Sequence, residues 1–598
     1  MPQLNAQLAA MFERMADVLQ LLDANKFKVN AYQRAARSLE TLEDDLAQMD
    51  EAQMKKIPGL GASMVAHIRE YLDTGRIAEF DELTSQIPAG VFELLDVPGL
   101  GPKTVALFWK DAGVDSVAAL KKALATGELE SLPRMGRKKL EGIAKSLAFM
   151  ESAGDRTRID VAMPLAEWIV DQLKGLPGVE RIDFAGSLRR GQETIGDIDI
   201  LVAADAPHAP QIAEAFTQLP IVADVIAHGQ SKCSIRTTQD AGRMQVDLRL
   251  VPPGSYGAAL MYFTGSKEHN VRLRERAIAQ GMTLNEYGLW REDAGDAAAE
   301  GKKKAGQKDA ERLVAADTEE HLYEALGLPW IAPPLREDRG ELKLAEAGEL
   351  PRLIELGDIK AELHAHTHAS DGSWSIEQLA RAAADRGFHT VAVTDHSKSS
   401  VQANGLSIDR LHRHIDAVHA VAKKLQGVIA VLAGSEVDIL GDGTLDYPDE
   451  VLARLDVVVA SPHVALSQEP DKATARLLKA LENPYVHILG HPTGRLVGRR
   501  PGLSPDIKQL VKAAAEHGVA LEINANGYRL DLRDTHAKLA LDAGCMLAID
   551  TDAHGLDNLD QLRYGVLTAQ RAGATAQQVI NCLDAAALRR WLRLKTQP

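Results

Sequence analysis

The sequence predicts a multidomain protein with a helical N-terminal part, an α+β middle part and a C-terminal part made of repeated parallel strand–helix units. Its 598 residues are several times the roughly 150 residues of a typical domain. Residues 1–150 carry apolar residues at helical spacing, residues 155–290 alternate strand-like and helix-like runs, and residues 358–598 repeat a strand followed by a helix about seven times. These three patterns predict the order of the domains.

The composition excludes several classes of protein. Charged residues make up 25% and hydrophobic residues 45% of the chain, as in ordinary globular proteins, and no apolar stretch approaches the roughly 20 residues of a membrane span. The N-terminus lacks a basic start followed by an apolar block, so no secretory signal is expected. The three widely spaced cysteines form neither a disulfide framework nor a zinc knuckle, which fits a reducing cytoplasm.

The N-terminal part is predicted to consist of short helices joined by three similar glycine turns. The turns read IPGLG at 57–61, VPGLG at 97–101 and, in degenerate form, LPRMG at 132–136. Glycines in this setting leave backbone N–H groups exposed at a helix start, a geometry that suits a phosphate oxygen and reads no base sequence. One copy would often be a purely structural turn.

Repetition of the turn favours binding to a DNA backbone. Two close copies are followed by a third that lies among basic residues, namely Arg134, Arg137, Lys138 and Lys139. The turns resemble helix-hairpin-helix motifs, which implies DNA contacts at Gly59, Gly61, Gly99 and Gly101. The whole-chain net charge of −16 argues mildly against nucleic-acid binding, but backbone amides would supply part of the attraction.

Three aspartates in the middle part are predicted to form a metal site. The run GDIDILV at 196–202 reads as a strand, and period-two alternation puts Asp197 and Asp199 on one face. Neighbouring carboxylates repel each other unless a cation lies between them. A third aspartate, Asp247, lies in the strand-like run 244–251, and three oxygen ligands suit Mg²⁺ beside substrate phosphates. A solvated strand edge with scattered acids is the alternative.

A strand that ends in Gly186 and Ser187 precedes the aspartates and is followed by a turn with two arginines. Ser187 and Arg190 would then hold the β and γ phosphates of a nucleotide. Gly-Ser lies ten residues before Asp-x-Asp, and an apolar-flanked aspartate follows about 50 residues later, which argues against scattered acids. The pattern resembles the nucleotidyltransferase superfamily.

The next segment resembles, more specifically, the family X DNA polymerases. It reads YFTGSKEHN at 262–270, then a helix-like run with Arg274, then GMTLNEY at 281–287. After this segment, the low-complexity residues 294–310 are expected to form a flexible loop. The resemblance covers residues 1–335 and implies a DNA-end-binding helical domain at 1–90, fingers with a helix-hairpin-helix at 91–150, a palm at 151–258 and a thumb at 259–335.

The same resemblance implies how the nucleotide and DNA are held. The catalytic, metal-binding residues would be Asp197, Asp199 and Asp247. The nucleotide-binding residues would be Gly186, Ser187, Arg190, Gly196, Tyr262, Phe263, Gly265 and Asn270. The two aromatic residues would flank the sugar, Asn270 would touch the nascent pair in the minor groove, and Arg274 would lie near the template strand.

Two positions depart from the family pattern. Members with 5′-deoxyribose-phosphate lyase activity carry a Schiff-base lysine where this chain has His67, and a histidine cannot form that imine. We therefore expect no lyase of that kind, although Lys26 and Lys28 could substitute. The position two before the third aspartate is often arginine in the family and is Gln245 here, so we expect catalysis to survive with a different tuning of Asp247.

The C-terminal part concentrates histidines at the ends of predicted strands. Fourteen of the 19 histidines lie within residues 358–598, and almost every β-like run there ends in His, Asp or Glu. In a parallel barrel, catalytic groups converge at that end of the strands. Any single histidine would more often be structural, but this repeated placement favours a metal cluster, and mixed imidazole and carboxylate ligands suit Zn²⁺, Mn²⁺ or Fe²⁺.

The motifs His-x-His, Ser-Asp-Gly, Thr-Asp-His and the closing Asp-Ala-His resemble the polymerase and histidinol phosphatase (PHP) domain. The resemblance implies a distorted (β/α)7 barrel at 358–598, after a linker at 336–357, with up to three metal ions. The nine implied ligands are His364, His366, Asp371, His396, Glu436, His463, His491, Asp552 and His554. All nine positions hold residues that can bind metal, so we expect an active phosphoesterase site.

Other residues near these motifs are given supporting roles. His368 alternates onto the ligand face but matches no family ligand, so it is expected to lie behind the ligands. Arg495 and Arg499 follow His491 and would hold DNA phosphates. Three further histidines, His412, His414 and His419, lie on one predicted helix and are expected at the surface.

Together the resemblances imply a bacterial-type family X DNA polymerase with a C-terminal PHP domain. We expect it to fill short gaps on gapped or 3′-recessed DNA with dNTPs and Mg²⁺ or Mn²⁺, and to degrade DNA as a Mn²⁺-favoured 3′–5′ exonuclease. Cutting at abasic sites and trimming of blocked 3′ ends are further activities open to it, and base-excision repair is the expected setting, in the cytoplasm and as a monomer. Two alternatives stay open: a small-molecule phosphatase tethered to a DNA-binding module, and a non-catalytic DNA-end adaptor.

Overall fold

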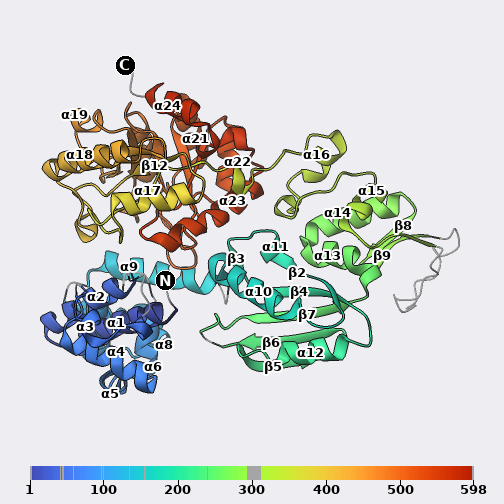
Figure 1. The fold of residues 1–598 in the computed structure, drawn as a ribbon, viewed down its shortest axis with the longest axis horizontal. Coiled ribbons are helices and arrows are strands. Elements are labelled where there is room, and N and C mark those ends of the chain that lie inside the picture. Colours follow the sequence, from blue (N-terminus) through green and yellow to red (C-terminus); the bar gives the residue numbers. More distant parts are fainter. Residues whose placement is uncertain are drawn as a thin grey trace.

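The computed structural model describes residues 3–594, apart from residues 41, 43–45, 58, 96, 98–99, 134, 154–155, 239 and 293–311. In Figure 1 the helical N-terminal unit (blue) lies beside the barrel (orange and red), and the palm sheet (teal) connects them to the thumb (green). The predicted loop at 294–310 and the predicted DNA contact Gly99 lie outside the described residues. None of the helices in the described ranges is long and apolar enough to cross a membrane.

The N-terminal unit is helical, as its periodicity predicts. One apolar cluster joins the first helices around Phe12, Tyr32 and Leu8, and a second cluster joins the later helices around Phe108 and Val105. The helices are α1 (Gln3–Leu21), α2 (Lys26–Glu40), α3 (Glu51–Met54), α4 (Ala62–Thr74), α5 (Ala78–Thr84), α6 (Ala89–Leu95), α7 (Pro102–Ala112), α8 (Val117–Thr126) and α9 (Arg137–Ala153).

The palm is a five-stranded sheet with the order β2-β4-β7-β6-β5, in which β4 and β7 run parallel and the other neighbours are antiparallel. Alternating apolar residues of β4 and β7 pack against α10 and α12. The elements are β1 (Thr157–Arg158), α10 (Ile159–Leu173), β2 (Val179–Phe184), α11 (Gly186–Arg189), β3 (Thr194–Ile195), β4 (Asp197–Ala204), α12 (Ala209–Thr217), β5 (Val222–His228), β6 (Lys232–Thr237) and β7 (Gln245–Val251).

The thumb places helices beside a small antiparallel sheet with the order β10-β9-β8. The segment predicted as a linker contains a helix, α16 (Glu341–Ala347), whose buried Glu341 accepts a hydrogen bond from the His269 ring at 2.7 Å. The first part of that segment therefore packs on the thumb. The other thumb elements are α13 (Tyr256–Thr264), α14 (Lys267–Ala279), β8 (Met282–Asn285), β9 (Gly288–Arg291), β10 (Leu313–Ala315) and α15 (Glu319–Ala325).

The C-terminal domain is a distorted parallel barrel of seven strands in sequential order, as predicted. A parallel bridge between Ala365 and Ala553 connects the first and last strand ends and nearly closes it. The strands are β11 (Ala361–Glu362), β12 (Thr390–Val393), β13 (Ala430–Asp438), β14 (Val457–Ser461), β15 (Ile488–Leu489), β16 (Ala520–Asn524) and β17 (Leu547–Asp550). The helices are α17 (Ile376–Asp385), α18 (Ile408–Lys424), α19 (Asp449–Leu452), α20 (Pro470–Leu481), α21 (Ile507–His517), α22 (Asp534–Asp542), α23 (Leu562–Arg571) and α24 (Ala585–Leu594).

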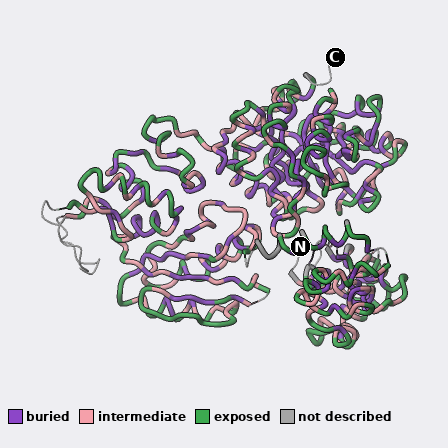
Figure 2. Tube along the Cα trace, turned by 180° about the vertical axis from the view of Figure 1, so that it is seen from behind, coloured by how far each residue is buried: buried purple, intermediate pink, exposed green. Residues whose placement is uncertain are grey.

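The barrel strands are buried on both faces, which explains why their sequences are apolar runs rather than alternating ones. Figure 2 shows the barrel as the region of the chain in which buried residues are most concentrated. Inside the barrel, Val457, Val459 and Ile488 meet Leu588 and Leu592 of α24, which close the end opposite the strand C-termini. The open end is the one that carries the polar residues.

The palm and the barrel share a packed interface. Val497, Leu530 and Tyr564 of the barrel domain belong to the apolar core of the palm. Two ion pairs join the palm to the barrel domain, Arg495–Glu193 at 2.6 Å and Arg563–Glu167 at 2.9 Å. Two more join the segment after the thumb to the barrel domain, Arg571–Glu337 at 2.8 Å and Arg339–Asp534 at 2.8 Å. The two domains are therefore held in one arrangement by apolar packing and by charge pairs together.

A buried carboxylate joins the palm to the thumb. Glu319 at the start of α15 accepts paired hydrogen bonds from Arg189 of α11 and from Arg336, whose side chain is fully buried. Burial raises the pKa of Glu319, but Arg336 and Arg189 lower it further, to about 2. This carboxylate is therefore ionised at neutral pH and pairs with the buried Arg336 and the partly buried Arg189.

We expect Glu319→Gln to lower the local stability of the thumb by about 3 kcal/mol, because it leaves the buried guanidinium group of Arg336 and the partly buried one of Arg189 without a counter-charge. In the wild type this stabilisation is fully present above the ordinary carboxyl pKa of 4.5 and is lost as the pH falls toward about 2. Amide hydrogen exchange in α14 and α15 measures it. Glu320→Gln, at the exposed neighbour, is the control, and equal protection in the two variants would contradict the account.

Candidate metal centres and nucleic-acid contacts

The three palm aspartates lie together at one end of the sheet. Asp197 and Asp199 are on β4, and Asp199 pairs in register with Asp247 on the parallel strand β7. One carboxylate oxygen of each lies within 4.8 Å of the other two, and exposure falls from Asp197, which is exposed, to Asp247, which is buried. The two adjacent parallel strands thus bring Asp197 and Asp199 together with Asp247, which lies about 50 residues later in the sequence.

The electrostatics of this triad favour a bound cation. Burial, followed by the neighbouring Asp197 carboxylate, raises the pKa of Asp199 to about 6. Burial also raises the pKa of Asp247, but hydrogen bonds from Lys232, Ser234 and Gln245 outweigh it and leave this pKa below its ordinary value. Divalent cations with oxygen ligands would relieve the repulsion between these carboxylates, so the donor set fits Mg²⁺ or Mn²⁺.

Two neighbouring side chains contact Asp247, and one of them occupies the position where the resembled family often has arginine. Gln245 donates a hydrogen bond to Oδ1 of Asp247 at 3.0 Å, and Nζ of Lys232 on β6 lies 2.6 Å from Oδ2. The sequence comparison identified Gln245 but not Lys232. Lys232 reaches Asp247 through the antiparallel register of β6 and β7, which no local pattern in the sequence reveals.

The Gly-Ser turn is built against the triad. Gly186 has φ +64°, and a Cβ there would lie 2.8 Å from Oδ2 of Asp199, so only glycine fits beside the carboxylate. Ser187 follows in the four-residue helix α11. Gly196, just before Asp197, lies against the guanidinium of Arg156. The turn therefore presents small residues and backbone next to the acids.

Arg190 is engaged by protein groups. Its Nε lies 3.0 Å from Glu337, and its Nη1 donates to the carbonyl of Thr264 at 2.6 Å. Gly265 has φ +69°, and a Cβ there would lie 3.2 Å from Nη1 of Arg190. Arg571 of the barrel domain binds both Glu337 and the carbonyl of Arg190. The arginine predicted to grip the triphosphate is thus connected to the barrel through one carboxylate.

The remaining predicted nucleotide contacts lie at the end of α13 and the start of α14. Tyr262 is 37% exposed and packs edge-on against Phe263, with ring centroids 5.1 Å apart. Asn270 donates to the carbonyl of Tyr262 at 2.7 Å, and Arg274 donates to the carbonyl of Asn270. The guanidinium of Arg249 lies 4.1 Å from the Phe263 ring centroid and 3.8 Å from Asp199. This aromatic pair is thereby connected to the triad.

The glycine turns lie at helix N-termini. Gly61 is the N-cap of α4, Gly101 is the N-cap of α7, and a Cβ at either would meet no atom within 4 Å. Gly59 has φ +91° and lies against Ser38. The third turn ends at Gly136, directly before α9. The two capping glycines are therefore open to an approaching group.

At the family's lysine position the chain has a compact polar cluster. Nδ1 of His67 lies 3.0 Å from the Tyr32 hydroxyl, and its Nε2 lies 3.2 Å from Glu79. Lys28, one of the two lysines that could substitute, also pairs with Glu79. His67 is thus held by two partners, and the nearby lysine is held by the same carboxylate.

At the open end of the barrel, eight of the nine predicted ligands form three overlapping groups. Within each group, one ligand atom of every residue lies within 4.8 Å of the others. Each pair of groups shares one residue: His366, His396 or Glu436. The groups are His366, Asp371, His396 and His554; His364, His366, Glu436 and Asp552; and His396, Glu436 and His463.

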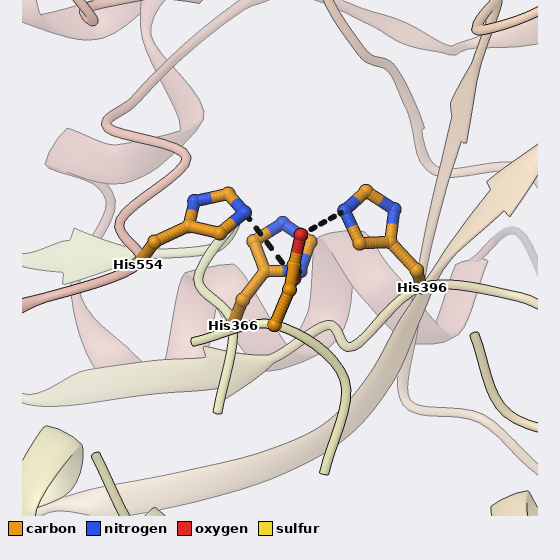
Figure 3. A group of neighbouring side chains, drawn as sticks. His366, His396 and His554 are labelled. Carbon is orange, nitrogen blue, oxygen red and sulfur yellow. Dashed lines mark ion pairs between the residues drawn. The ribbon is translucent and has the colours of Figure 1, made fainter. Parts of the chain in front are cut away.

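Figure 3 shows how the first group meets: the rings of His554 and His396 lie on either side of His366. The His366 ring centroid is 4.3 Å from each of these two rings. Asp371 lies 3.4 Å from His554 and 3.6 Å from His396. Four ligands from three separate segments of the chain thus converge on one point, at the ends of the first, second and last strands.

Several buried atoms of the predicted ligands have no hydrogen-bond partner of good geometry. In the three groups they are Nε2 of His364, Nδ1 and Nε2 of His366, Nδ1 of His396, Oε2 of Glu436 and Oδ1 of Asp552, and outside the groups Nδ1 of His491. Some of these atoms lie close to one another: Nε2 of His366 is 2.9 Å from Oδ1 of Asp552, and Nδ1 of His396 is 2.8 Å from Oε2 of Glu436. Buried polar atoms without partners are costly, and such atoms are rare in folded proteins. Imidazole nitrogens and carboxylate oxygens facing one another are what Zn²⁺, Mn²⁺ or Fe²⁺ would complete, so the residues fit the metals that the resemblance implies.

Carboxylates outside the nine ligands orient two of the histidines. Glu522 on β16 binds Nδ1 of His364 at 2.6 Å, and Asp438 on β13 binds Nδ1 of His463 at 2.5 Å. Each contact turns the Nε2 atom toward Glu436. Carboxylates in this position fix the tautomer of a ligating histidine. Sequence analysis missed both, because strand-end acids that bind metal and those that bind histidine look alike.

His368, His414 and His491 lie outside these groups. His491 belongs to none of the three groups found among the described residues, but its Nε2 lies 2.9 Å from Glu436. His368 is exposed and its ring binds the carbonyl of Trp374. The prediction that His414 lies at the surface is wrong: it is buried, and its Nε2 pairs with Asp395 at 2.8 Å. A buried carboxylate below the ligands draws it inward.

Comparison with known proteins covers nearly the whole chain. A PolX protein of Bacillus subtilis, described as "DNA polymerase/3'-5' exonuclease PolX", is 36% identical over 571 residues, which are 96% of each chain. Probable phosphatases of Thermoanaerobacter and Syntrophotalea carbinolica are each 29% identical but match only 39% and 37% of this chain, while covering 94% and 92% of their own length. Family models match as a helix-hairpin-helix domain at 3–77, a SAM-like helix-hairpin-helix tandem at 91–148, a DNA polymerase beta thumb at 259–337 and a PHP domain at 362–526.

We expect metal binding at the barrel to release protons at pH 7.5. Burial lowers the pKa of the ligand histidines, but neighbouring carboxylates outweigh it and raise the pKa of His463 to about 10 and that of His554 to about 9. Both are protonated without metal at this pH, and a cation must displace those protons. Apparent Mn²⁺ affinity should therefore fall as the pH is lowered.

Calorimetric titration with Mn²⁺ in buffers of different ionisation enthalpy measures this release. His463→Asn should reduce it by about one proton, because one protonated ligand is removed. His419→Asn, at an exposed position on α18, is the control and should match the wild type. Heats that do not depend on the buffer would contradict the account.

Proposed function

This chain belongs to the PolX family, and we propose that it is a DNA-directed DNA polymerase that fills short gaps and also degrades DNA as a 3′–5′ exonuclease. The observation that carries the proposal is the presence of two separate sets of metal ligands, one of carboxylates on the palm and one of mixed histidines and carboxylates on the barrel. Both belong to a chain whose N-terminal helices begin at glycine turns suited to DNA phosphates.

For nucleotide addition, the palm residues have distinct tasks. Asp197, Asp199 and Asp247 would hold two Mg²⁺ or Mn²⁺ ions, which would lower the pKa of the attacking 3′-hydroxyl and stabilise the leaving pyrophosphate. Gly186 lets the backbone approach the phosphates, and Ser187 donates its hydroxyl to them. Arg190 reaches the triphosphate only after it exchanges Glu337 for phosphate oxygens, so nucleotide binding competes with an internal ion pair.

The residues of α13 and α14 position the sugar and the base. Tyr262 and Phe263, which pack edge-on against each other, flank the deoxyribose and screen against a 2′-hydroxyl. Asn270 and Arg274, linked to each other and to the Tyr262 carbonyl, face the new base pair and the template strand. The open glycine turns at Gly61 and Gly101 bind the DNA backbone without reading sequence.

For hydrolysis, the nine barrel residues hold up to three ions of Mn²⁺, Zn²⁺ or Fe²⁺, which when bound activate a water and stabilise charge on a phosphodiester. Glu522 and Asp438 keep two of the histidines oriented toward that site. The substrate is the 3′ end of DNA, with trimming of blocked ends and cutting at abasic sites as related reactions. Repair of gapped or 3′-recessed DNA, as a monomer, joins the two activities.

A small-molecule phosphatase is the second candidate, because the phosphatase relatives match the barrel half. Against it stand the palm triad and the glycine turns, neither of which a phosphatase needs. Turnover on a 3′-recessed duplex compared with turnover on histidinol phosphate separates the two: preference for the duplex supports the nuclease.

We expect the two sites to fail independently. Asp197→Ala with Asp199→Ala should abolish nucleotide addition on a one-nucleotide-gapped duplex and spare 3′ shortening, and His364→Ala with His366→Ala should do the reverse. Loss of metal ligands should reduce activity by more than the roughly 10- to 100-fold reduction that follows the loss of a residue supporting a ligand. Extension with dNTPs and shortening without them, both in Mn²⁺, are the readouts.

Matched controls remove residues of the same kind away from the sites. Asp205→Ala follows β4 at an exposed position, and His419→Ala lies on the outer face of α18. Both should retain the two activities. If either double variant stays folded and loses both activities, the division of labour between palm and barrel is wrong.

A further inference from the structure

A cavity of about 840 Å³ lies between the palm and the barrel domain, apart from both metal centres. Its palm wall comes from residues 156–161 and 193–194, and its barrel wall comes from residues 493–507 and 531–536. In Figure 1 these walls belong to the region where β3 and α10 lie below the barrel. The cavity is thus formed only when the two domains pack together.

The walls are strongly basic in a chain that is acidic as a whole. The cavity is lined by six arginines and by two carboxylates, those of Glu193 and Asp531, whereas the full chain carries a net charge of −16. The arginines are Arg156, Arg158, Arg495, Arg499, Arg500 and Arg533. Guanidinium groups gathered in a partly enclosed space create a local positive potential that attracts phosphate.

Some of these arginines build the walls. Arg158 pairs with Asp160 at 2.9 Å and stacks on the Tyr528 ring, 3.5 Å from its centroid. Arg495 binds Glu193 across the domain boundary through both terminal nitrogens. These contacts fix the shape of the cavity, and each arginine is paired with one carboxylate, Asp160 or Glu193. Arg495, which the sequence predicted to hold DNA phosphate, is therefore mainly a structural link.

Other groups are left for a ligand. Arg499 and Arg533 are exposed, and neither takes part in an ion pair among the residues that the structure describes. The side chain of Arg495 is only 5% exposed, yet its Nε has no hydrogen-bond partner, and the buried Nδ1 of His536 has none either. A buried guanidinium N–H without a partner, as at Arg495, is a donor that an anion in this cationic cavity would complete.

Each wall contains a residue close in sequence to a metal centre. Thr194 of the palm wall lies three residues before Asp197, and Thr493 of the barrel wall lies two residues after His491. The Tyr528 ring faces Arg158 and Arg499, so the cavity offers guanidinium groups in place of a free aromatic platform for bases. Recognition here is suited to a sugar-phosphate backbone and not to base identity.

We propose that this arginine-lined cavity binds the phosphodiester backbone of a single-stranded 3′ end on its way between the palm triad and the barrel cluster. The inference rests on the proposed function and extends it: an unpaired 3′ end released by the polymerase reaches the nuclease of the same molecule. Arg499 and Arg533 contact phosphates of that strand, while Arg158 and Arg495 keep the walls in place.

The test reverses the two free charges in the full chain, with Arg499→Glu and Arg533→Glu combined. Binding of a fluorescent oligo-dT should weaken about tenfold, and the slope of log affinity against log salt should shrink by about 1.4, as for two lost phosphate contacts. Removal of an unpaired 3′ nucleotide from a primer should slow about tenfold. Gap filling from a paired primer end should stay within about twofold, because that end does not enter the cavity.

The control makes the same charge change in another arginine-lined cavity. Arg454 and Arg589 line a cavity at the opposite end of the barrel, so Arg454→Glu with Arg589→Glu should leave oligo-dT binding unchanged. Arg499→Lys with Arg533→Lys should retain most of the binding, which guards against misfolding as the cause. Equal behaviour of the two glutamate variants overturns the proposal.

Two further outcomes are decisive. If dTTP competes with oligo-dT at the cavity as strongly as unlabelled oligo-dT does at equal phosphate concentration, the cavity is a mononucleotide site and the proposal fails. If the wild type shows neither extension nor shortening of DNA but its oligo-dT binding is still lost on charge reversal, the strand site stands and the proposed function falls.

Discussion

Carboxylates and imidazoles gathered in two clusters of potential metal ligands determine how this molecule is built. At the palm, Asp199 lies between Asp197 and Asp247, and burial with like charge raises its pKa. At the barrel, buried nitrogens and oxygens of the ligand groups face one another without hydrogen-bond partners. Both sites carry a cost that a divalent cation removes, and the surrounding fold serves to hold the ligands in place despite that cost.

The support for these sites comes from neighbouring elements of each domain. In the palm, Lys232 and Gln245 bind Asp247 from two adjacent strands, and Gly186 provides the space beside Asp199. In the barrel, Glu522 and Asp438 bind the outer nitrogen of a ligand histidine. Ligands on strands, backed by groups on the next strand, are held more rigidly than ligands on loops.

The palm and the barrel domain are linked by charged side chains at their interface. Glu337 receives Arg190 from the palm and Arg571 from the barrel domain, and Arg571 also pairs with Asp534. The group expected to bind the triphosphate therefore shares a carboxylate with a helix of the nuclease domain. Tyr528 and Arg158 add a second contact across the same boundary. Such contacts fix the relative placement of the two sites, on which any transfer of DNA between them depends.

Local patterns in the sequence, with the family resemblance they carry, predicted the candidate ligands but not the side chains that contact them. Period two predicted that Asp197 and Asp199 share a face, and repeated strand ends predicted the polar end of the barrel. Lys232 could not be found, because its contact depends on the register between β6 and β7.

Two other features were also beyond prediction from the sequence. The burial of His414 depends on Asp395, which lies on a different segment of the chain. The cavity between the palm and the barrel depends on how two domains pack, and residues hundreds of positions apart form its walls.

Anomalous diffraction from Mn²⁺-soaked crystals of the full chain tests the cation requirement most directly. The account predicts anomalous peaks inside the three overlapping groups at the open end of the barrel and among the palm aspartates, each within bonding distance of the residues that form those groups. Ordered Mn²⁺ bound elsewhere, with both clusters keeping direct contacts between their own side chains, would contradict it.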